Sequence, residues 1–151
     1  MTGQRQILDL LRLQIASRCG THLAGTYIDA AVKVHVTRSS VAAGDDVDAP
    51  HARQFSFPDD SSTQDILNRI FKAGYLASIA GGYASWIVTS HIPIAVIAQQ
   101  WPAARMLTLS PNDQGKTDRA NGEMRLHFEY HEQADPEAIY ARLQSFARMQ
   151  L

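Results

Sequence analysis

Hydrophobic and polar residues alternate regularly along residues 26–38. Every second position there carries an apolar side chain, and most of these are β-branched: Ile28, Ala30, Val32, Val34 and Val36. A period of two places alternate side chains on opposite faces of an extended chain, and β-branched residues favour strands. The pattern therefore predicts a strand with one apolar and one polar face. Shorter runs over 53–58, 105–110 and 123–133 predict three further strands.

The central part of the chain, residues 75–101, has no charged side chain. No Asp, Glu, Lys or Arg lies between Lys72 and Arg105, although 19% of the whole sequence is charged. Two strand-like runs, 83–90 and 94–100, are separated by His91-Ile92-Pro93, which predicts an antiparallel hairpin. Apolar residues occur on both faces of each run, so both faces of the hairpin should be covered. The stretch is too interrupted to cross a membrane, which takes about 20 predominantly apolar residues.

Three segments have helical periodicity. Residues 4–18 carry apolar residues at three- and four-residue steps, and Gly20 follows as a stop. A second helix should begin where Ser61 and Gln64 fit a capping box, and it should end at Gly74. The third should begin at Asp135-Pro136, since Asp is a good N-cap and Pro suits the first helical position. Its buried face should hold three residues flanked by Tyr140: Ile139, Leu143 and Phe146.

These elements follow one another in the order α-β-β-α-β-β-β-β-α. Strands joined by short connections pair mainly antiparallel, and helices then pack on the sheet that they form. We therefore predict an α+β fold with a mainly antiparallel sheet of about five to six strands. The length fits a single globular domain over residues 1–151.

Composition narrows the classes of function. The net charge of −1 argues against a nucleic-acid partner and against binding to an anionic membrane surface, both of which require basic patches. Cys19 is the only cysteine, so neither an intramolecular disulfide nor a zinc site of several cysteines can form, as is typical of a cytoplasmic protein. Gly81-Gly82 lies in no phosphate-loop or dinucleotide motif, and no cofactor is predicted.

The strongest candidate for chemistry is the polar side of the strand over 123–133. His127, Glu129 and His131 alternate with apolar residues, so they share one face at a spacing of about 7 Å. His35 would join them if the first and last strands were neighbours. Imidazoles beside a carboxylate could support acid–base chemistry or hold a metal ion, which would make the chain a small hydrolase or isomerase. A solvated sheet face with ordinary cross-strand pairs explains the same pattern.

A second candidate set marks the two ends of the uncharged hairpin: Tyr83, Gln99, Gln100 and Trp101. A glutamine at the end of so apolar a strand needs hydrogen-bond partners, so these residues are predicted to line a ligand-binding surface. The favoured hypothesis is a binding module that forms a homodimer through the hairpin. Its further ligand would be a small molecule or another protein, whereas the enzyme is the alternative.

Overall fold

The computed structural model describes residues 31–41, 50–114 and 119–149. The predicted helix over 4–18, Cys19 and residues 26–30 of the first predicted strand lie outside this part of the chain. The elements in chain order are β1 (Ala31–Arg38), β2 (Arg53–Pro58), α2 (Thr63–Lys72), β3 (Ser85–Ser90), β4 (Ile92–Ala98), β5 (Arg105–Met106), α3 (Pro111–Gln114), β6 (Arg119–Ala120), β7 (Glu123–Tyr130) and α4 (Pro136–Met149).

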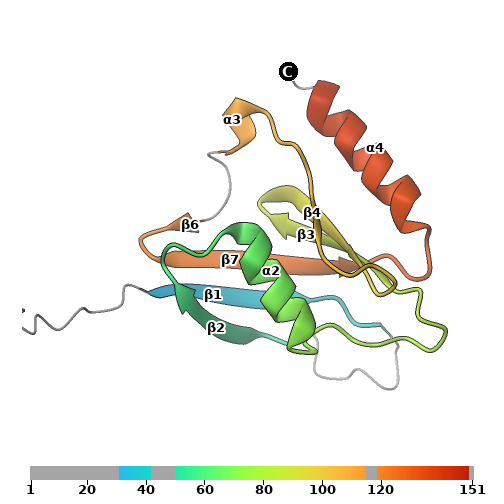
Figure 1. Cartoon of the computed structure of the whole chain (residues 1–151), viewed down its shortest axis with the longest axis horizontal. Coiled ribbons are helices and arrows are strands. Elements are labelled where there is room, and N and C mark those ends of the chain that lie inside the picture. The colour runs from blue at the N-terminus through green and yellow to red at the C-terminus, as the bar shows by residue number, and fades with distance from the viewer. Residues whose placement is uncertain (1–30, 42–49, 115–118, 150–151) are drawn as a thin grey trace, which may run out of the picture.

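The seven strands of the described residues belong to one sheet, in the order β2-β1-β7-β3-β4-β5, with the short β6 paired to β7. Every pair is antiparallel except β1 with β7, which run parallel and join distant parts of the chain. The predicted α+β class is confirmed, and the order of the described elements roughly matches the predicted order (Figure 1).

The segment over 111–122, for which the sequence analysis predicts no helix or strand, contains two short elements. α3 and β6 both lie in it, and a tight turn at Asn121-Gly122 connects β6 to β7. Both turn residues have positive φ, 56° and 73°, as a two-residue type I′ hairpin turn requires. Asn-Gly is the strongest short signal for such a hairpin, and the sequence interpretation overlooked it.

α2 lies across one face of the sheet (Figure 1). Its three fully buried side chains are Ile66, Leu67 and Ile70, which belong to the same core cluster as Trp86 and Phe128 from the strands. The cap of α2 differs by one residue from the prediction. Ser62 rather than Ser61 is the N-cap, and its Oγ accepts a hydrogen bond from the Asp65 amide at 3.1 Å, so Asp65 takes the place predicted for Gln64.

Both faces of the β3–β4 hairpin are covered, as predicted. Trp86, Ile87 and Val88 are successive residues of β3 and all are buried. On the face away from α2, three residues of the hairpin region contact α4: Val96, Ala98 and Trp101. The turn is tighter than the predicted one, because β4 already begins at Ile92 and only His91, with φ 62°, separates the strands. Within the described residues, no helix is long and apolar enough to cross a bilayer.

Side-chain hydrogen bonds connect α4 to the backbone of β5 and of the segment that follows it. The Gln144 side-chain amide accepts a hydrogen bond from the Thr108 amide at 2.8 Å and donates one to the Thr108 carbonyl at 3.1 Å. The Tyr140 hydroxyl donates to the Met106 carbonyl at 3.0 Å. At the start of the helix, Asp135 Oδ1 accepts from the Glu137 amide, as its predicted capping role requires. Side chains of α4 thus satisfy backbone groups at this edge of the sheet.

Candidate functional site

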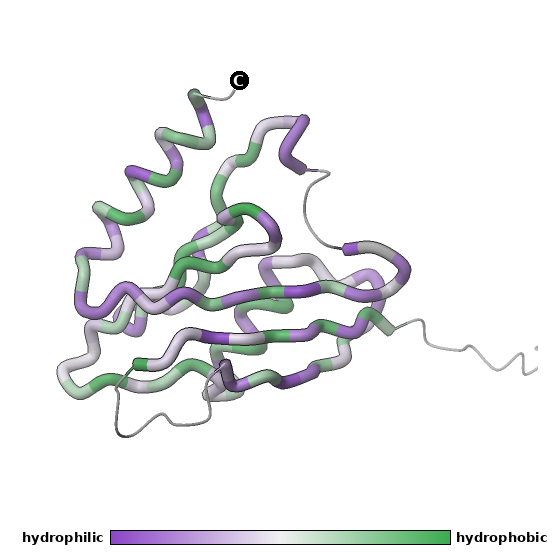
Figure 2. The backbone as a smooth tube through the Cα atoms, turned by 180° about the vertical axis from the view of Figure 1, so that it is seen from behind, coloured by the Kyte–Doolittle hydropathy of each residue, from purple (hydrophilic) through white to green (hydrophobic). Residues whose placement is uncertain are grey.

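The polar row on β7 lies on the opposite face of the strand from its buried apolar residues, as predicted. Met124, Leu126 and Phe128 are buried, whereas Glu129 is exposed and His127 is half-buried. Seen from behind, β7, β1 and β2 lie toward the viewer, and hydrophilic residues alternate with hydrophobic ones along them (Figure 2). α4 covers only the β3–β4 side of this face. The row is therefore open along β2, β1 and β7 within the described structure.

The register of β1 on β7 decides which of these side chains meet. The two strands are neighbours, but Thr37 lies opposite His127 and His35 lies opposite Arg125. Thr37 Oγ1 and His127 Nδ1 share a hydrogen bond of 2.8 Å. Farther along, His131 Nε2 lies 3.5 Å from Glu129 Oε1, an ion pair only when the imidazole is protonated. The predicted residues form separate pairs, and no group of three or more His, Cys, Asp or Glu suited to a metal occurs among the described residues.

Gln99, from the second candidate set, holds the loop over 78–84. Its Oε1 accepts hydrogen bonds from the amides of Ile79 at 3.1 Å and Ala84 at 3.4 Å. Its Nε2 donates to Ser78 Oγ at 2.8 Å and to the Ile79 carbonyl at 3.3 Å. All four contacts of this amide are internal, which explains how a glutamine is accommodated at the end of an apolar strand.

Gln99→Ala is expected to lower the free energy of unfolding by about 1–3 kcal/mol, because backbone groups of the loop lose their partners. Gln100→Ala is the matched control, since the neighbouring glutamine is exposed and should cost less than about 0.5 kcal/mol. Urea denaturation followed by circular dichroism measures both. Equal effects of the two substitutions would contradict this role for Gln99.

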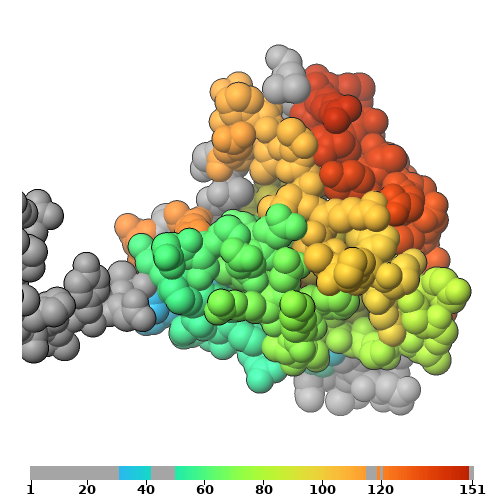
Figure 3. Space-filling view, in the orientation of Figure 1, coloured from blue at the N-terminus to red at the C-terminus, as the bar shows by residue number. Residues whose placement is uncertain are grey.

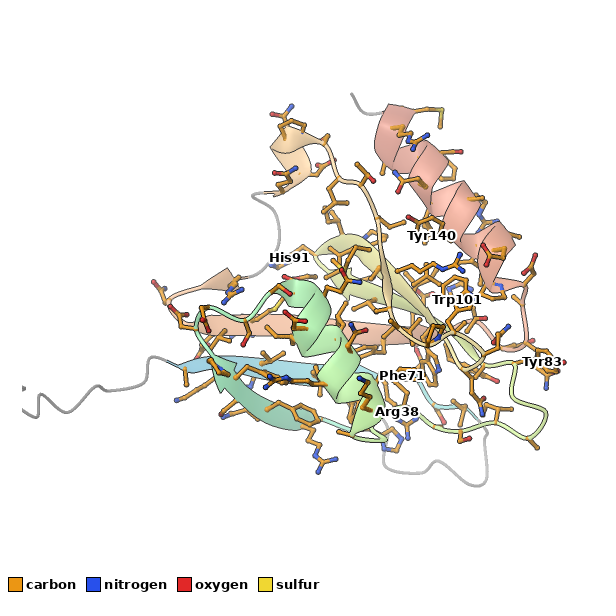
Figure 4. All side chains as sticks on the ribbon, in the orientation of Figure 1. Arg38, Phe71, Tyr83, His91, Trp101 and Tyr140 are labelled. Atoms are coloured by element: carbon orange, nitrogen blue, oxygen red, sulfur yellow. The ribbon has the colours of Figure 1, made fainter. Side chains whose placement is uncertain are left out.

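The other three residues of the second candidate set lie in different surroundings. The Trp101 indole is buried against α4, and the Arg105 guanidinium lies 3.9 Å from its ring centroid. Tyr83 is 56% exposed on the loop beyond Gln99 and points away from the sheet (Figure 4). Gln100 is also exposed. The four residues therefore do not converge on one surface.

An apolar groove lies elsewhere, between the C-terminal half of α4 and the turn of the hairpin. It has a volume of about 130 Å³ and eight lining residues: Ile92, Pro93, Leu107, Leu109, Asp113, Leu143, Phe146 and Ala147. Asp113 is the one acidic residue among them, and its carboxylate accepts a hydrogen bond from Ser110 Oγ at 2.9 Å. The chain before α3 and the helix α4, which form two walls, lie side by side in the space-filling view (Figure 3).

Comparison with known protein families, with curated proteins and with solved structures finds no match to this chain.

The exposure of Phe146 shows that the predicted buried face of α4 is wrong at this position. This residue was expected on the buried face with Ile139 and Leu143, yet it is 55% exposed, and Met149 one turn later is 72% exposed. The apolar stripe is longer than the surface that covers it. The buried cluster beside the helix reaches Leu143, whereas Phe146 borders the groove beside Ile92 and Pro93, at the start of β4. The signal was present in the sequence, since the three-residue step from Leu143 to Phe146 continues to Met149.

Proposed function

We propose that the chain is a binding module and that its contact surface is the apolar groove beside the hairpin turn. The observation that supports this most strongly is a groove lined by seven apolar residues with two exposed apolar side chains, Phe146 and Met149, on the helix that forms its wall. Contiguous exposed apolar patches, unlike single exposed apolar residues, often mark interaction sites.

A second copy of the chain fits this surface best. Phe146 both lines the groove and protrudes from it, so one surface carries a protruding ring and a depression next to each other. In a two-fold arrangement, the ring of each copy could enter the depression of the other, which is the self-complementarity that such dimers require. Asp113, the single acidic residue in the lining, already accepts a hydrogen bond from Ser110. A partner without a complementary positive charge therefore suits this surface.

Only the turn end of the β3–β4 hairpin takes part in self-association through this groove. Most of β3 and β4 is covered inside the chain by α2 and α4. Ile92 and Pro93, at the start of β4, are the hairpin residues that line the groove. The turn, together with α4, would therefore provide the contact rather than the length of the hairpin.

The alternative function, an enzyme acting through the polar row, has less support. His127 is paired with Thr37, His131 lies by Glu129, and His35 lies opposite Arg125. None of these histidines lines the groove. General acid–base chemistry needs groups that converge on one bound substrate, and these pairs are spread along an open strand.

Hydrogen exchange at two protein concentrations tests the proposed surface. At about 100 µM, amides in 107–113 and 143–149 should exchange at least about threefold more slowly than at about 1 µM, because a second copy covers them. Amides on β1, whose polar face lies away from the groove, serve as the internal control and should not change. Concentration-dependent protection along β1, with none at the groove, would contradict the proposal.

A further inference from the structure

The sheet has an open edge at β2 (Arg53–Pro58). β2 stands first in the order of the strands and pairs, within the described residues, with β1 alone. Figure 1 shows it as the outermost strand, below β1. The apolar groove is lined by residues of β4, of α4 and of the chain after β5, so it lies toward the other edge of the sheet. The edge of β2 and the groove are therefore separate surfaces.

The register of β1 shows which backbone groups of β2 point to this edge. The Lys33 amide donates at 2.8 Å to the carbonyl of the residue before β7, so the backbone groups of Lys33 face β7. Successive residues of a strand direct these groups to opposite sides, so Val34 faces β2 and its partner Phe55 faces β1. The N–H and C=O of Gln54 and Ser56 therefore point outward. Among the described residues, nothing pairs with these outward groups.

The middle of this edge has no feature that prevents pairing with another chain. Edge strands usually carry charged residues, prolines or bulges for that purpose. In β2 such residues stand only at the ends, where Arg53 is the first residue and Pro58 is the last. The residues between them, 54–57, are uncharged and include two phenylalanines.

The charges at the two ends of β2 have opposite signs. Arg53 begins the strand, Asp59 and Asp60 follow its last residue, and all three are exposed. Two strands that pair antiparallel bring the start of each strand near the end of the other. A second copy of β2 would thus place each Arg53 near the two carboxylates of the partner copy, whereas parallel pairing would bring like charges together.

We propose that a second copy of the chain pairs with this edge, β2 against β2, in an antiparallel arrangement about a two-fold axis at Phe55. In this register Gln54 lies opposite Ser56 of the partner copy, so every outward N–H and C=O of these residues is hydrogen-bonded. A register centred on Ser56 would set Gln54 opposite Pro58, which has no N–H to donate. The two Phe55 side chains lie directly across from each other, and each is only partly buried against its own core.

This contact does not depend on the groove. It involves one short strand of each copy, so it should form only at higher protein concentration than a contact of ordinary size. A copy that used both surfaces would join groove-mediated dimers into longer assemblies, because each two-fold contact adds a further copy.

Amide hydrogen exchange of the unmodified chain, measured by nuclear magnetic resonance, tests the proposal. At about 1 mM protein, the amides of Gln54 and Ser56 should exchange about twofold more slowly than at about 50 µM, because a second copy covers them. The Lys33 amide, already bonded within the sheet, is the internal control and should not change. Failure of the groove contact would appear at 107–113 and 143–149 and would leave this result unaffected.

Two other outcomes of this measurement would overturn the proposal. Fast exchange of Gln54 and Ser56 at both concentrations would show that no second copy binds and would leave the edge open to a different protein. Slow exchange that is already complete at about 50 µM, with no dependence on concentration, would show that another part of the same chain covers the edge.

Ser56→Pro should abolish the concentration dependence at Gln54. It removes an outward N–H that no hydrogen bond of the sheet uses, and edge strands tolerate proline at such positions. Ser56→Thr keeps the N–H and suits a strand, so this matched control should retain the twofold slowing. Unchanged exchange at Lys33 verifies that the sheet of each variant is intact. Full slowing at Gln54 in an intact Ser56→Pro variant would show that edge pairing is not its cause.

Charge reversal tests the antiparallel arrangement. Arg53→Glu should reduce the slowing, because each new glutamate would lie near Asp59 and Asp60 of the partner copy. Adding Asp59→Arg and Asp60→Arg to the same chain returns opposite charges to the two ends and should restore the slowing. If this triple variant pairs as weakly as Arg53→Glu alone, two copies do not pair antiparallel at this edge and the proposal is wrong.

Discussion

Replacing Trp86 with alanine is expected to lower the free energy of unfolding by about 3–5 kcal/mol. Trp86 is the largest fully buried side chain and lies in the middle of the uncharged stretch. Its ring packs against Tyr130 with ring centroids 4.9 Å apart and an interplanar angle of 43°. Truncation removes this contact and leaves a cavity in a hairpin that is covered on both faces. Since domains of this kind are stable by about 5–15 kcal/mol, the variant should be close to unfolding at 37 °C.

Chemical denaturation followed by far-ultraviolet circular dichroism measures this loss. Tyr83→Ala is the control, because Tyr83 is an aromatic residue of the same segment that is 56% exposed and should cost less than about 1 kcal/mol. A cost below about 1 kcal/mol for Trp86→Ala would show that the hairpin is not the core of the sheet.

Replacing Phe146 with alanine is expected to weaken self-association by about 30-fold or more, which corresponds to about 2 kcal/mol. Phe146 is the exposed ring beside the groove, and aromatic side chains at the centre of an interface contribute most of the binding energy. Alanine also favours the helix, so α4 itself should persist. Size-exclusion chromatography with light scattering measures the dissociation constant of each variant.

The control for this prediction is again Tyr83→Ala, which removes an equally exposed aromatic ring, 56% against 55%, far from the groove. It should leave the dissociation constant unchanged. If Tyr83→Ala and Phe146→Ala weaken association equally, the contact is not the groove. A melting temperature for each variant separates loss of association from loss of folding.

Local patterns in the sequence were sufficient to predict most of the fold. Alternation of Val32, Val34 and Val36 with polar residues identified β1, because side-chain direction along a strand depends only on position. The hairpin and its two covered faces followed from apolar residues at successive positions of β3 and β4. The start of α4 at Asp135-Pro136 followed from capping chemistry, which is equally local.

The sites depend on information that no local pattern contains. The parallel register that sets Thr37, rather than His35, opposite His127 results from how two distant strands pair. The sequence analysis predicts Gln99 on a ligand-binding surface, whereas its side-chain amide forms hydrogen bonds with the loop over 78–84. Helical spacing predicted the apolar stripe of α4, but the packing of the helix against the sheet reaches only Leu143 and leaves Phe146 exposed.

Sedimentation velocity of the unmodified chain is the most direct test of the central claim that the groove mediates self-association. Across about 1–100 µM protein, the sedimentation coefficient should rise from the value of a monomer to that of a dimer, with a dissociation constant on the order of 10 µM. The Phe146→Ala variant should remain monomeric over most of that range. A single monomeric species for the unmodified chain at every concentration would contradict the account.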